Sequence, residues 1–240
     1  MFLLERNDDH ARLTLSRPEA RNAIPQAGWA ELADVVARVA ASDARLLVVT
    51  GAGGAFCAGA DFGDFPAMRG DEALVARFRE DMRRALDALR DLTIPTLALV
   101  DGACYGAGVA LAIACDLRIA GSRAEFAITP AKIGISYPQE DVHRLVQLIG
   151  PARAAQMLFT ANRIRGEEAV AIGLADYHGS HESEVIEAIL ANDPASIRTL
   201  KRAIALAAED VRSDPDMDAR FDALLAGEEA ARRLEALRRK

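Results

Sequence analysis

Two glycine-rich segments carry the residue types best suited to chemistry in this sequence. They are GAGGAFCAGAD at 51–61 and DGACYGAG at 101–108, and each follows an apolar run that predicts a buried strand. Neither has the GKS or GKT ending of a Walker loop or the GxGxxG spacing of a dinucleotide-binding loop. Small residues let backbone N–H groups approach a substrate oxygen, so the pair favours an oxyanion hole. The structural alternative is two tight turns that pack helices on strands.

The segments around these loops alternate between strand and helix patterns. Strands are expected around Leu13 and Leu15 and at 45–51, 96–100 and 117–120, and helices at 28–42, 72–90 and 109–115. This alternation predicts an α/β fold with parallel strands. Because ligands bind beyond the carboxyl ends of such strands, we expect the two glycine loops to meet there.

The chain beyond residue 138 has only helical patterns. The stretch DVHRLVQLIG at 141–150 repeats apolar residues at helical spacing and ends at Gly150 and Pro151. Further helices are expected up to Lys240. No Gly/Ser linker or repeat marks a boundary, so we expect a core over 1–185 and a helical C-terminal region over 186–240 within one structural unit.

Composition narrows the possible classes of function. The chain has 240 residues, 51% of them apolar, and a formal net charge of −7, which predicts a globular protein that repels nucleic acid. Its three cysteines lack CxxC spacing, so neither disulfides nor a metal site is expected. The amino terminus lacks a signal-peptide core, and no apolar run is long enough for a bilayer. We therefore expect a cytoplasmic protein without a membrane partner.

Five motifs in order resemble the enoyl-CoA hydratase/isomerase, or crotonase, superfamily. They are SRPEARNAI (16–24), VVTGAGGAFCAGADF (48–62), DGACYGAGVALAIACDLRIA (101–120), FAITPAKIGIS (126–136) and EEAVAIGLAD (167–176). The resemblance implies a crotonase-like core of repeated ββα turns and a helical C-terminal trimerisation region. It also implies an acyl-CoA thioester substrate, no cofactor beyond the CoA that the substrate carries, and a homotrimer or a dimer of trimers.

The resemblance assigns functions to residues of both glycine loops. It implies that the backbone N–H groups of Ala60 and Ala107 form an oxyanion hole that stabilises a thioester enolate. It also implies contacts to CoA from the turn before the first loop and from the loop itself, at Ala23, Ala58, Ala60, Asp61 and Phe62. The first loop is nearly free of side chains because, on this interpretation, its backbone does the chemistry.

The sequence departs from the family at two catalytic positions. Hydratases of the family add water with two glutamates, and the matching positions here hold Ala110 and Pro130. Neither side chain can transfer a proton, so hydration by two glutamates is not expected. The pattern TPxxxGxxY also resembles the methylmalonyl-CoA decarboxylase branch, which implies that Tyr137 lies in the active site. A malonyl-type thioester would form its enolate by losing CO2, without a general base.

Tyr137, Glu140 and Asp141 are the candidate acid–base residues. Ser136 and Gln139 have capping-box spacing, which predicts both carboxylates in the first turn of a helix. There they could instead complement the helix dipole, and Glu140 could pair with Arg144, so a structural role is the alternative. Which carboxylate faces the pocket depends on a helix rotation that the pattern leaves open.

The sequence thus predicts an acyl-CoA-processing enzyme of fatty acid metabolism. It would be a lyase or isomerase, hydratase-like or decarboxylase-like, with non-standard acid–base residues. The alternative is a catalytically silent member that binds acyl-CoA or serves as a scaffold. The acyl group, the exact reaction and the choice between trimer and hexamer stay open.

Overall fold

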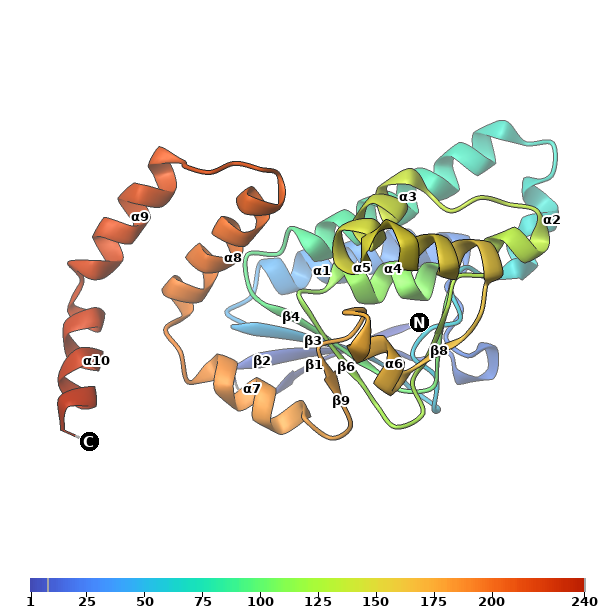
Figure 1. The fold of residues 1–240 in the computed structure, drawn as a ribbon. Coiled ribbons are helices and arrows are strands. Elements are labelled where there is room, and N and C mark those ends of the chain that lie inside the picture. Colours follow the sequence, from blue (N-terminus) through green and yellow to red (C-terminus); the bar gives the residue numbers. More distant parts are fainter. Residues whose placement is uncertain (8, 240) are drawn as a thin grey trace.

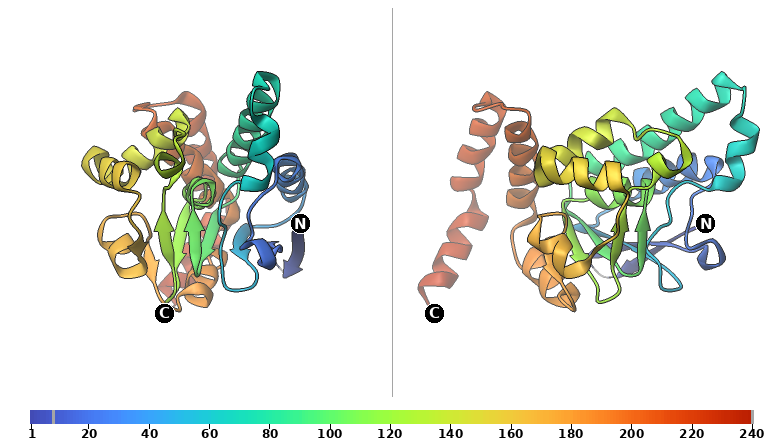
Figure 2. Two further views of the ribbon diagram at one scale, coloured as in Figure 1. Left: turned by 90° about the vertical axis from the view of Figure 1, so that its right-hand side faces the viewer. Right: turned by 45° about the vertical axis from the view of Figure 1, so that its right-hand side comes forward.

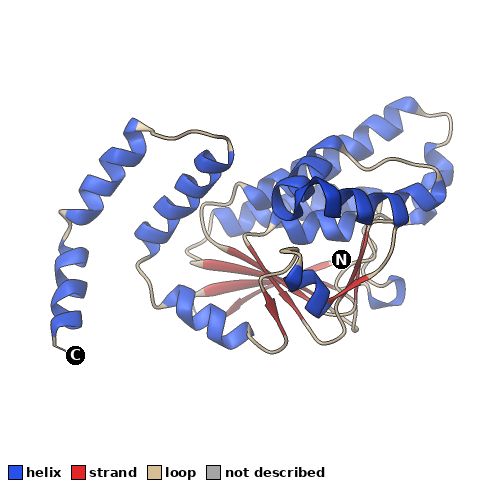
Figure 3. Cartoon of the chain, in the orientation of Figure 1, coloured by secondary structure: helices blue, strands red, loops and turns tan. Residues whose placement is uncertain are grey.

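The computed structural model describes residues 1–7 and 9–239 and has a central sheet with helices on both faces (Figures 1 and 3). The sheet runs in the order β1-β2-β3-β4-β6-β9, and every pair except the antiparallel β1 and β2 is parallel. Its strands are β1 (Phe2–Asn7), β2 (His10–Leu15), β3 (Leu46–Gly51), β4 (Thr96–Val100), β6 (Leu117–Ala120) and β9 (Tyr177–His178). The α/β fold class is therefore confirmed.

A second, smaller sheet lies beside the carboxyl ends of the first. It contains β5 (Ala103–Tyr105), β7 (Glu125–Ala127) and β8 (Ile164–Arg165), with β7 in the middle. Strand β5 follows β4 after only two residues, so the second glycine loop passes directly from one sheet to the other. This crossing holds the loop between the two sheets.

Two layers of apolar side chains join the helices to the central sheet. The larger core includes Trp29, Phe56 and Phe126, all fully buried. Helices α1 (Gln26–Ala40), α3 (Glu72–Arg90), α4 (Ala107–Ala114) and α5 (Gln139–Thr160) cover that face in Figure 1. Helix α7 (Glu182–Leu190) packs Val185 and Ile186 on the other face. The short helices are α2 (Phe65–Met68) and α6 (Gly166–Ala171), with 3-10 turns at Pro18–Ala20, Phe62–Asp64 and Pro130–Ile133.

The chain ends in three helices that leave the body of the molecule. They are α8 (Pro194–Ala208), α9 (Pro215–Leu225) and α10 (Glu228–Arg238), and α9 and α10 stand away from the sheet in Figures 1 and 2. Lys201 ties α8 to the body by donating to the Ile94 carbonyl at 2.9 Å and to Asp116 at 2.7 Å. Large apolar side chains are exposed along this arm at Leu200, Ile204, Phe221, Leu225, Leu234 and Leu237.

The expected elements agree closely with the observed ones around the glycine loops. The strands at 96–100 and 117–120 and the helix at 72–90 have the predicted bounds, and the elements expected at 28–42, 45–51 and 109–115 differ by one or two residues at their ends. The wholly helical pattern expected beyond residue 138 is wrong at the short strands β8 and β9, which pair with strands of the core. Within the described part of the chain, no helix is both long enough and apolar enough to cross a bilayer. The division into a core and a helical C-terminal region stays a prediction.

Candidate functional site

The two glycine loops pack against each other through their backbones. The N–H groups of Phe56 and Cys57 both donate to the Ala103 carbonyl at 3.0 Å, and the Tyr105 N–H donates to the Cys57 carbonyl at 2.9 Å. Such bonds fix the two segments relative to each other as strands are fixed in a sheet. The loops therefore meet as the sequence predicts.

Glycine is required where the loops approach most closely. A Cβ atom added at Gly59 would lie 2.6 Å from the Tyr105 oxygen and 3.0 Å from the Ala107 nitrogen, and one at Gly108 would lie 2.2 Å from the Cys57 oxygen. Gly59 also has a φ of +95°, a backbone conformation that favours glycine. These contacts place the first loop directly against the start of α4.

The N–H groups of Ala60 and Ala107 have no acceptor among the residues that the structure describes. Ile24 bonds to the Gly59 oxygen and the Asp61 nitrogen, so the Ala60 N–H, between them, faces the opposite side. The Ala107 N–H belongs to the first residue of α4, where a helix leaves its N–H groups unpaired. Both groups are thus available to a substrate oxygen.

Tyr137 lies against the start of α4, on the carbonyl side of the peptide whose N–H belongs to Ala107. Its hydroxyl donates to the Gly106 carbonyl at 3.0 Å, and its side chain is buried. Burial raises the pKa of Tyr137 well above its usual value, the Asp141 charge raises it further, and the backbone N–H of Ala110 lowers it. The phenol is therefore protonated at neutral pH, and the raised pKa makes it a weaker acid than an ordinary tyrosine.

Asp141 is fully buried in the first turn of α5. Its Oδ1 accepts a hydrogen bond from Arg83 Nη1 of α3 at 2.8 Å, while its Oδ2 has no hydrogen-bond partner among residues 1–7 and 9–239. Burial raises the pKa of this carboxyl above its usual value, against the lowering effect of the Arg83 hydrogen bond and charge. The carboxyl group is thus enclosed by protein and pairs with α3.

Glu140, the neighbouring candidate, is exposed. The expected pair between Glu140 and Arg144 is not formed, because Arg144 instead binds Asp87 of α3 at 2.6 Å. The capping-box prediction is also wrong. Pro138 occupies the N-cap of α5 in place of Ser136, so the helix begins two residues later than the box requires and Gln139 is its first residue, not its third.

The residues expected to contact CoA lie together around an arginine that the sequence reasoning did not single out. Arg17 Nη1 donates to the Ala23 carbonyl at 3.1 Å and to Asp61 Oδ2 at 2.5 Å. The Arg17 hydrogen bond, followed by that from the Gly63 N–H, lowers the pKa of Asp61. Arg17 stands inside the first quoted motif, but nothing in its local pattern indicates a partner 44 residues away.

The other two expected CoA contacts flank this ion pair. The Ala58 N–H donates to the Arg21 carbonyl at 2.9 Å, which joins the first glycine loop to the turn that precedes α1. Phe62 is exposed, and its ring centroid lies 5.3 Å from that of Phe65. An exposed aromatic ring beside the loop offers a flat apolar surface to a ligand.

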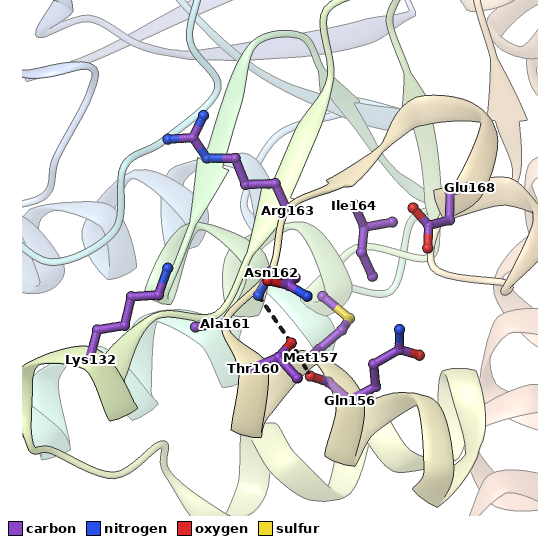
Figure 4. Close-up of a pocket in the computed structure, with 9 residues that line it drawn as sticks. All are labelled: Lys132, Gln156, Met157, Thr160, Ala161, Asn162, Arg163, Ile164 and Glu168. Carbon is purple, nitrogen blue, oxygen red and sulfur yellow. Dashed lines mark hydrogen bonds between the residues drawn. The ribbon is translucent and has the colours of Figure 1, made fainter.

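A separate pocket of about 480 Å³ lies between α5 and the segment that leads into β8 (Figure 4). Thr160, one of the lining residues in Figure 4, accepts a hydrogen bond from the Asn162 N–H through its hydroxyl, which donates to the Gln156 carbonyl. Its rim includes Lys132 and Arg163. None of the expected site residues lines this pocket, so it is distinct from the paired loops.

The expectation of no metal or cofactor stays a prediction. Within residues 1–7 and 9–239, no three His, Cys, Asp or Glu side chains are grouped so that they could hold a metal ion. The three cysteines are free and buried, and burial raises the pKa of Cys57 to about 12. A thiol with that pKa is a weak nucleophile at neutral pH.

Comparisons with known proteins agree with the motifs. The enoyl-CoA hydratase/isomerase family model matches residues 5–224. An enoyl-CoA isomerase/hydratase of Mycosarcoma maydis is 30% identical over 246 residues, which cover 95% of this chain and 89% of that protein. The (E)-benzylidenesuccinyl-CoA hydratase of Thauera aromatica is 33% identical over 215 residues, 85% of this chain and 81% of that one.

A solved structure extends the agreement to the whole fold. The crystal structure of an enoyl-CoA hydratase/isomerase family protein from Hyphomonas neptunium matches with a TM-score of 0.91 and 33% identity, over 98% of this chain and 94% of that one. The crotonase-like architecture expected from the motifs is confirmed by this match. The chain belongs to the enoyl-CoA hydratase/isomerase family, the crotonase superfamily.

Proposed function

We propose that the protein is an acyl-CoA-processing enzyme that stabilises a thioester enolate in an oxyanion hole made by the N–H groups of Ala60 and Ala107. The observation that carries the proposal is that neither N–H group has an acceptor among the described residues, while their loops are held together by backbone bonds. A fixed donor of this kind contributes about 10² to 10³ in rate. Two such donors would supply a large part of the rate enhancement that enolate formation requires.

Tyr137 and Asp141 are the proposed acid–base groups, and Glu140 is a third candidate that would act only on a group reaching the exposed start of α5. With a malonyl-type thioester, the C–CO2 bond breaks and its electron pair forms the enolate, after which an acid protonates the α-carbon. With other thioesters, a carboxylate would first remove the α-proton. The enzyme would accordingly be a lyase or an isomerase.

CoA would bind along the Arg17 ion pair. The proposed contacts are Ala23, Ala58, Ala60, Asp61 and Phe62, with Arg17 holding Asp61 and the Ala23 carbonyl in place. Support comes from the relatives, because the Thauera aromatica protein is named as a hydratase of a CoA ester. Which acyl group this chain accepts is left to the experiment below.

The proposal includes a homo-oligomer, a trimer or a dimer of trimers. Support comes from the exposed apolar side chains of α8, α9 and α10, since such a face is usually covered by another chain. We also propose that the protein is cytoplasmic, because its three cysteines are free thiols and the cytoplasm is a reducing compartment. One relative, from Bos taurus, is named as mitochondrial.

A catalytically silent acyl-CoA-binding protein is the second candidate. The observation in its favour is that Ala110 and Pro130, at the positions where the resemblance implies the glutamates, carry no titratable group. Such a protein would bind CoA esters at the same loops and leave them unchanged.

Proton exchange at the α-carbon separates the two candidates. The protein is incubated in D2O with saturated, enoyl and malonyl-type CoA thioesters, and deuterium uptake and loss of CO2 are followed by mass spectrometry. Uptake or CO2 loss above the uncatalysed rate supports the enzyme, and the responding ester identifies the reaction class. Binding of esters with neither change would overturn the enzymatic proposal in favour of the silent one.

A further inference from the structure

The turn that precedes α1 is bonded to the first glycine loop on both sides of Ala60. The Ile24 N–H donates to the Gly59 carbonyl at 2.8 Å, and the Asp61 N–H donates to the Ile24 carbonyl at 2.9 Å. These two bonds make a parallel bridge between Ile24 and Ala60. The direction in which the Ala60 N–H points is therefore set by the position of this turn.

The Asn22 side chain holds the same turn against the other end of the loop. Its Nδ2 donates to the Ala52 carbonyl at 2.9 Å and to the Ala55 carbonyl at 2.8 Å, and it lies 3.3 Å from the Phe56 carbonyl. Its Oδ1 accepts a hydrogen bond from the Arg17 N–H at 2.9 Å. Because carbonyls only accept and a backbone N–H only donates, these partners fix which end of the amide is the nitrogen.

The backbone conformation and the partners of Asn22 together require asparagine. Its φ is +58°, in the left-handed region, and its side chain is fully buried. Glycine, asparagine and aspartate tolerate this region best. Glycine has no side-chain donor, and an aspartate carboxylate would direct oxygens at the carbonyls. Asparagine alone among the three supplies two N–H donors and an acceptor on a short side chain.

The connection from Asn22 to Ala60 is short and has little slack. Two residues of chain span at most about 7 Å, so a shift of the Asn22 anchor moves Ile24 and, through its bridge, Ala60. On the other side of the loop, Gly59 packs directly against the backbone that carries the Ala107 N–H. The distance between the two N–H groups thus depends on the turn as well as on the contact between the loops.

We infer that Asn22 is a positioning residue for the Ala60 N–H, an inference that rests on the proposed function. Its amide holds the turn against the start of the first glycine loop, and Ile24 then directs the Ala60 N–H towards the substrate oxygen. An oxyanion donor binds the developing enolate more strongly than the ground-state carbonyl. Misplacing the donor therefore lowers kcat more than it weakens substrate binding.

Two substitutions at position 22 test this inference. Asn22→Gly keeps the left-handed turn and removes every side-chain bond. Asn22→Asp keeps the size of the side chain and the bond from the Arg17 N–H, but it replaces the donor to the carbonyls. Unfolding temperatures, measured first with saturating ester present, show which variant is folded at the assay temperature, and one folded variant is sufficient for the test.

Thr96→Val is the matched control. Thr96 is also buried, and its hydroxyl donates to Asp116 Oδ2 at 2.9 Å. It lies at the start of β4, whereas the second glycine loop follows the other end of that strand. The control therefore loses a buried side-chain hydrogen bond, and with it stability, without touching either loop.

The first readout is the separation of kcat from KM for α-proton exchange in D2O. Losing the alignment of one oxyanion donor should lower kcat about 10²-fold in a folded Asn22 variant, with KM changed less than about threefold. Thr96→Val should leave both constants unchanged. A purely structural Asn22 would lower the unfolding temperature, as Thr96→Val does, and leave kcat of the folded protein intact. A rise in KM alone would also overturn the inference.

Infrared spectroscopy of a bound saturated CoA thioester, labelled with carbon-13 at its carbonyl, gives a second readout that needs no turnover. Hydrogen bonds from the oxyanion hole should lower the carbonyl stretching frequency in the wild type and in Thr96→Val relative to water. The folded Asn22 variant should show a smaller lowering. If the wild type exchanges protons but the Asn22 variant matches Thr96→Val in kcat and frequency, only this inference is overturned. If no ester exchanges in the wild type, the proposed function fails and the inference fails with it.

Discussion

Gly59→Ala tests whether the contact between the two loops creates the oxyanion hole. The added Cβ atom would lie 2.6 Å from the Tyr105 oxygen and 3.0 Å from the Ala107 nitrogen, both of them backbone atoms that have no rotamer to change. The loops must therefore separate until these contacts are relieved. That movement displaces the Ala60 N–H relative to the Ala107 N–H, while the residues that carry these donors are unchanged.

Gly70→Ala is the matched control for this substitution. Gly70 also has positive φ, +80°, but a Cβ atom there would meet nothing within 4 Å. Both variants bear the cost of a non-glycine residue in a left-handed conformation, about 1–2 kcal/mol of stability. The difference between them therefore reports the clash alone.

The expected loss of activity follows from the displacement. Misplacing a reacting group by about 1 Å costs about 10²-fold in rate, and losing one oxyanion donor costs about 10²–10³-fold. We expect Gly59→Ala to lower the rate of α-proton exchange by about 10²-fold or more at saturating ester and Gly70→Ala by less than about threefold. Both variants are assayed below their unfolding temperatures. If Gly59→Ala, folded, exchanges protons as fast as Gly70→Ala, the paired loops are not the oxyanion hole.

Three further predictions concern single side chains. Tyr137→Phe, which removes the hydroxyl and its interactions with the backbone of Gly106 and Ala110, should keep its fold and lose about 10²-fold or more in turnover if the phenol is the acid; unchanged turnover would exclude that role. The pKa of Asp141 is raised on folding, so its contribution to stability is largest below about pH 4, the unfolded value. The difference in unfolding free energy between the wild type and Asp141→Asn should therefore fall as pH rises from about 4, and it should level off above the pKa of Asp141 in the folded protein. Chemical denaturation at each pH measures this difference. A difference that rises with pH would contradict the direction of the shift. Arg17→Met should raise KM for the CoA ester about three- to tenfold with kcat little changed, because Arg17 is partly exposed and holds Asp61 in place. A fall in kcat alone would argue against a CoA-binding role.

Local patterns were sufficient to predict the elements that carry the site. The strands at 96–100 and 117–120 are short apolar runs closed by glycine, aspartate or polar residues, and α3 has a clear helical repeat. The meeting of the two glycine loops followed from one general rule about parallel sheets. Both features depend on neighbouring residues or on topology, and these can be inferred from one sequence.

Long-range ion pairs could not be predicted in the same way. Arg17 binds Asp61 across 44 residues, and Arg83 binds Asp141 across 58. An arginine on an amphipathic helix looks the same in the sequence whether it is solvated or faces a buried carboxylate. The predicted pair of Glu140 with Arg144 failed for this reason, because Asp87 on another helix is the stronger competitor for Arg144.

The position of Tyr137 links the missing glutamates to the proposed acid. Its hydroxyl lies between the Gly106 carbonyl and the backbone of Ala110, where the resemblance implies that hydratases carry their first glutamate. Ala110 is fully buried, so a longer side chain there would start beside the phenol with no solvent to extend into. Under the proposed function, Tyr137 would carry out near the start of α4 the proton transfer that the resemblance assigns to a glutamate at position 110. The proposed function would then keep enolate stabilisation by the two backbone N–H groups and replace a carboxylate with a phenol as the acid.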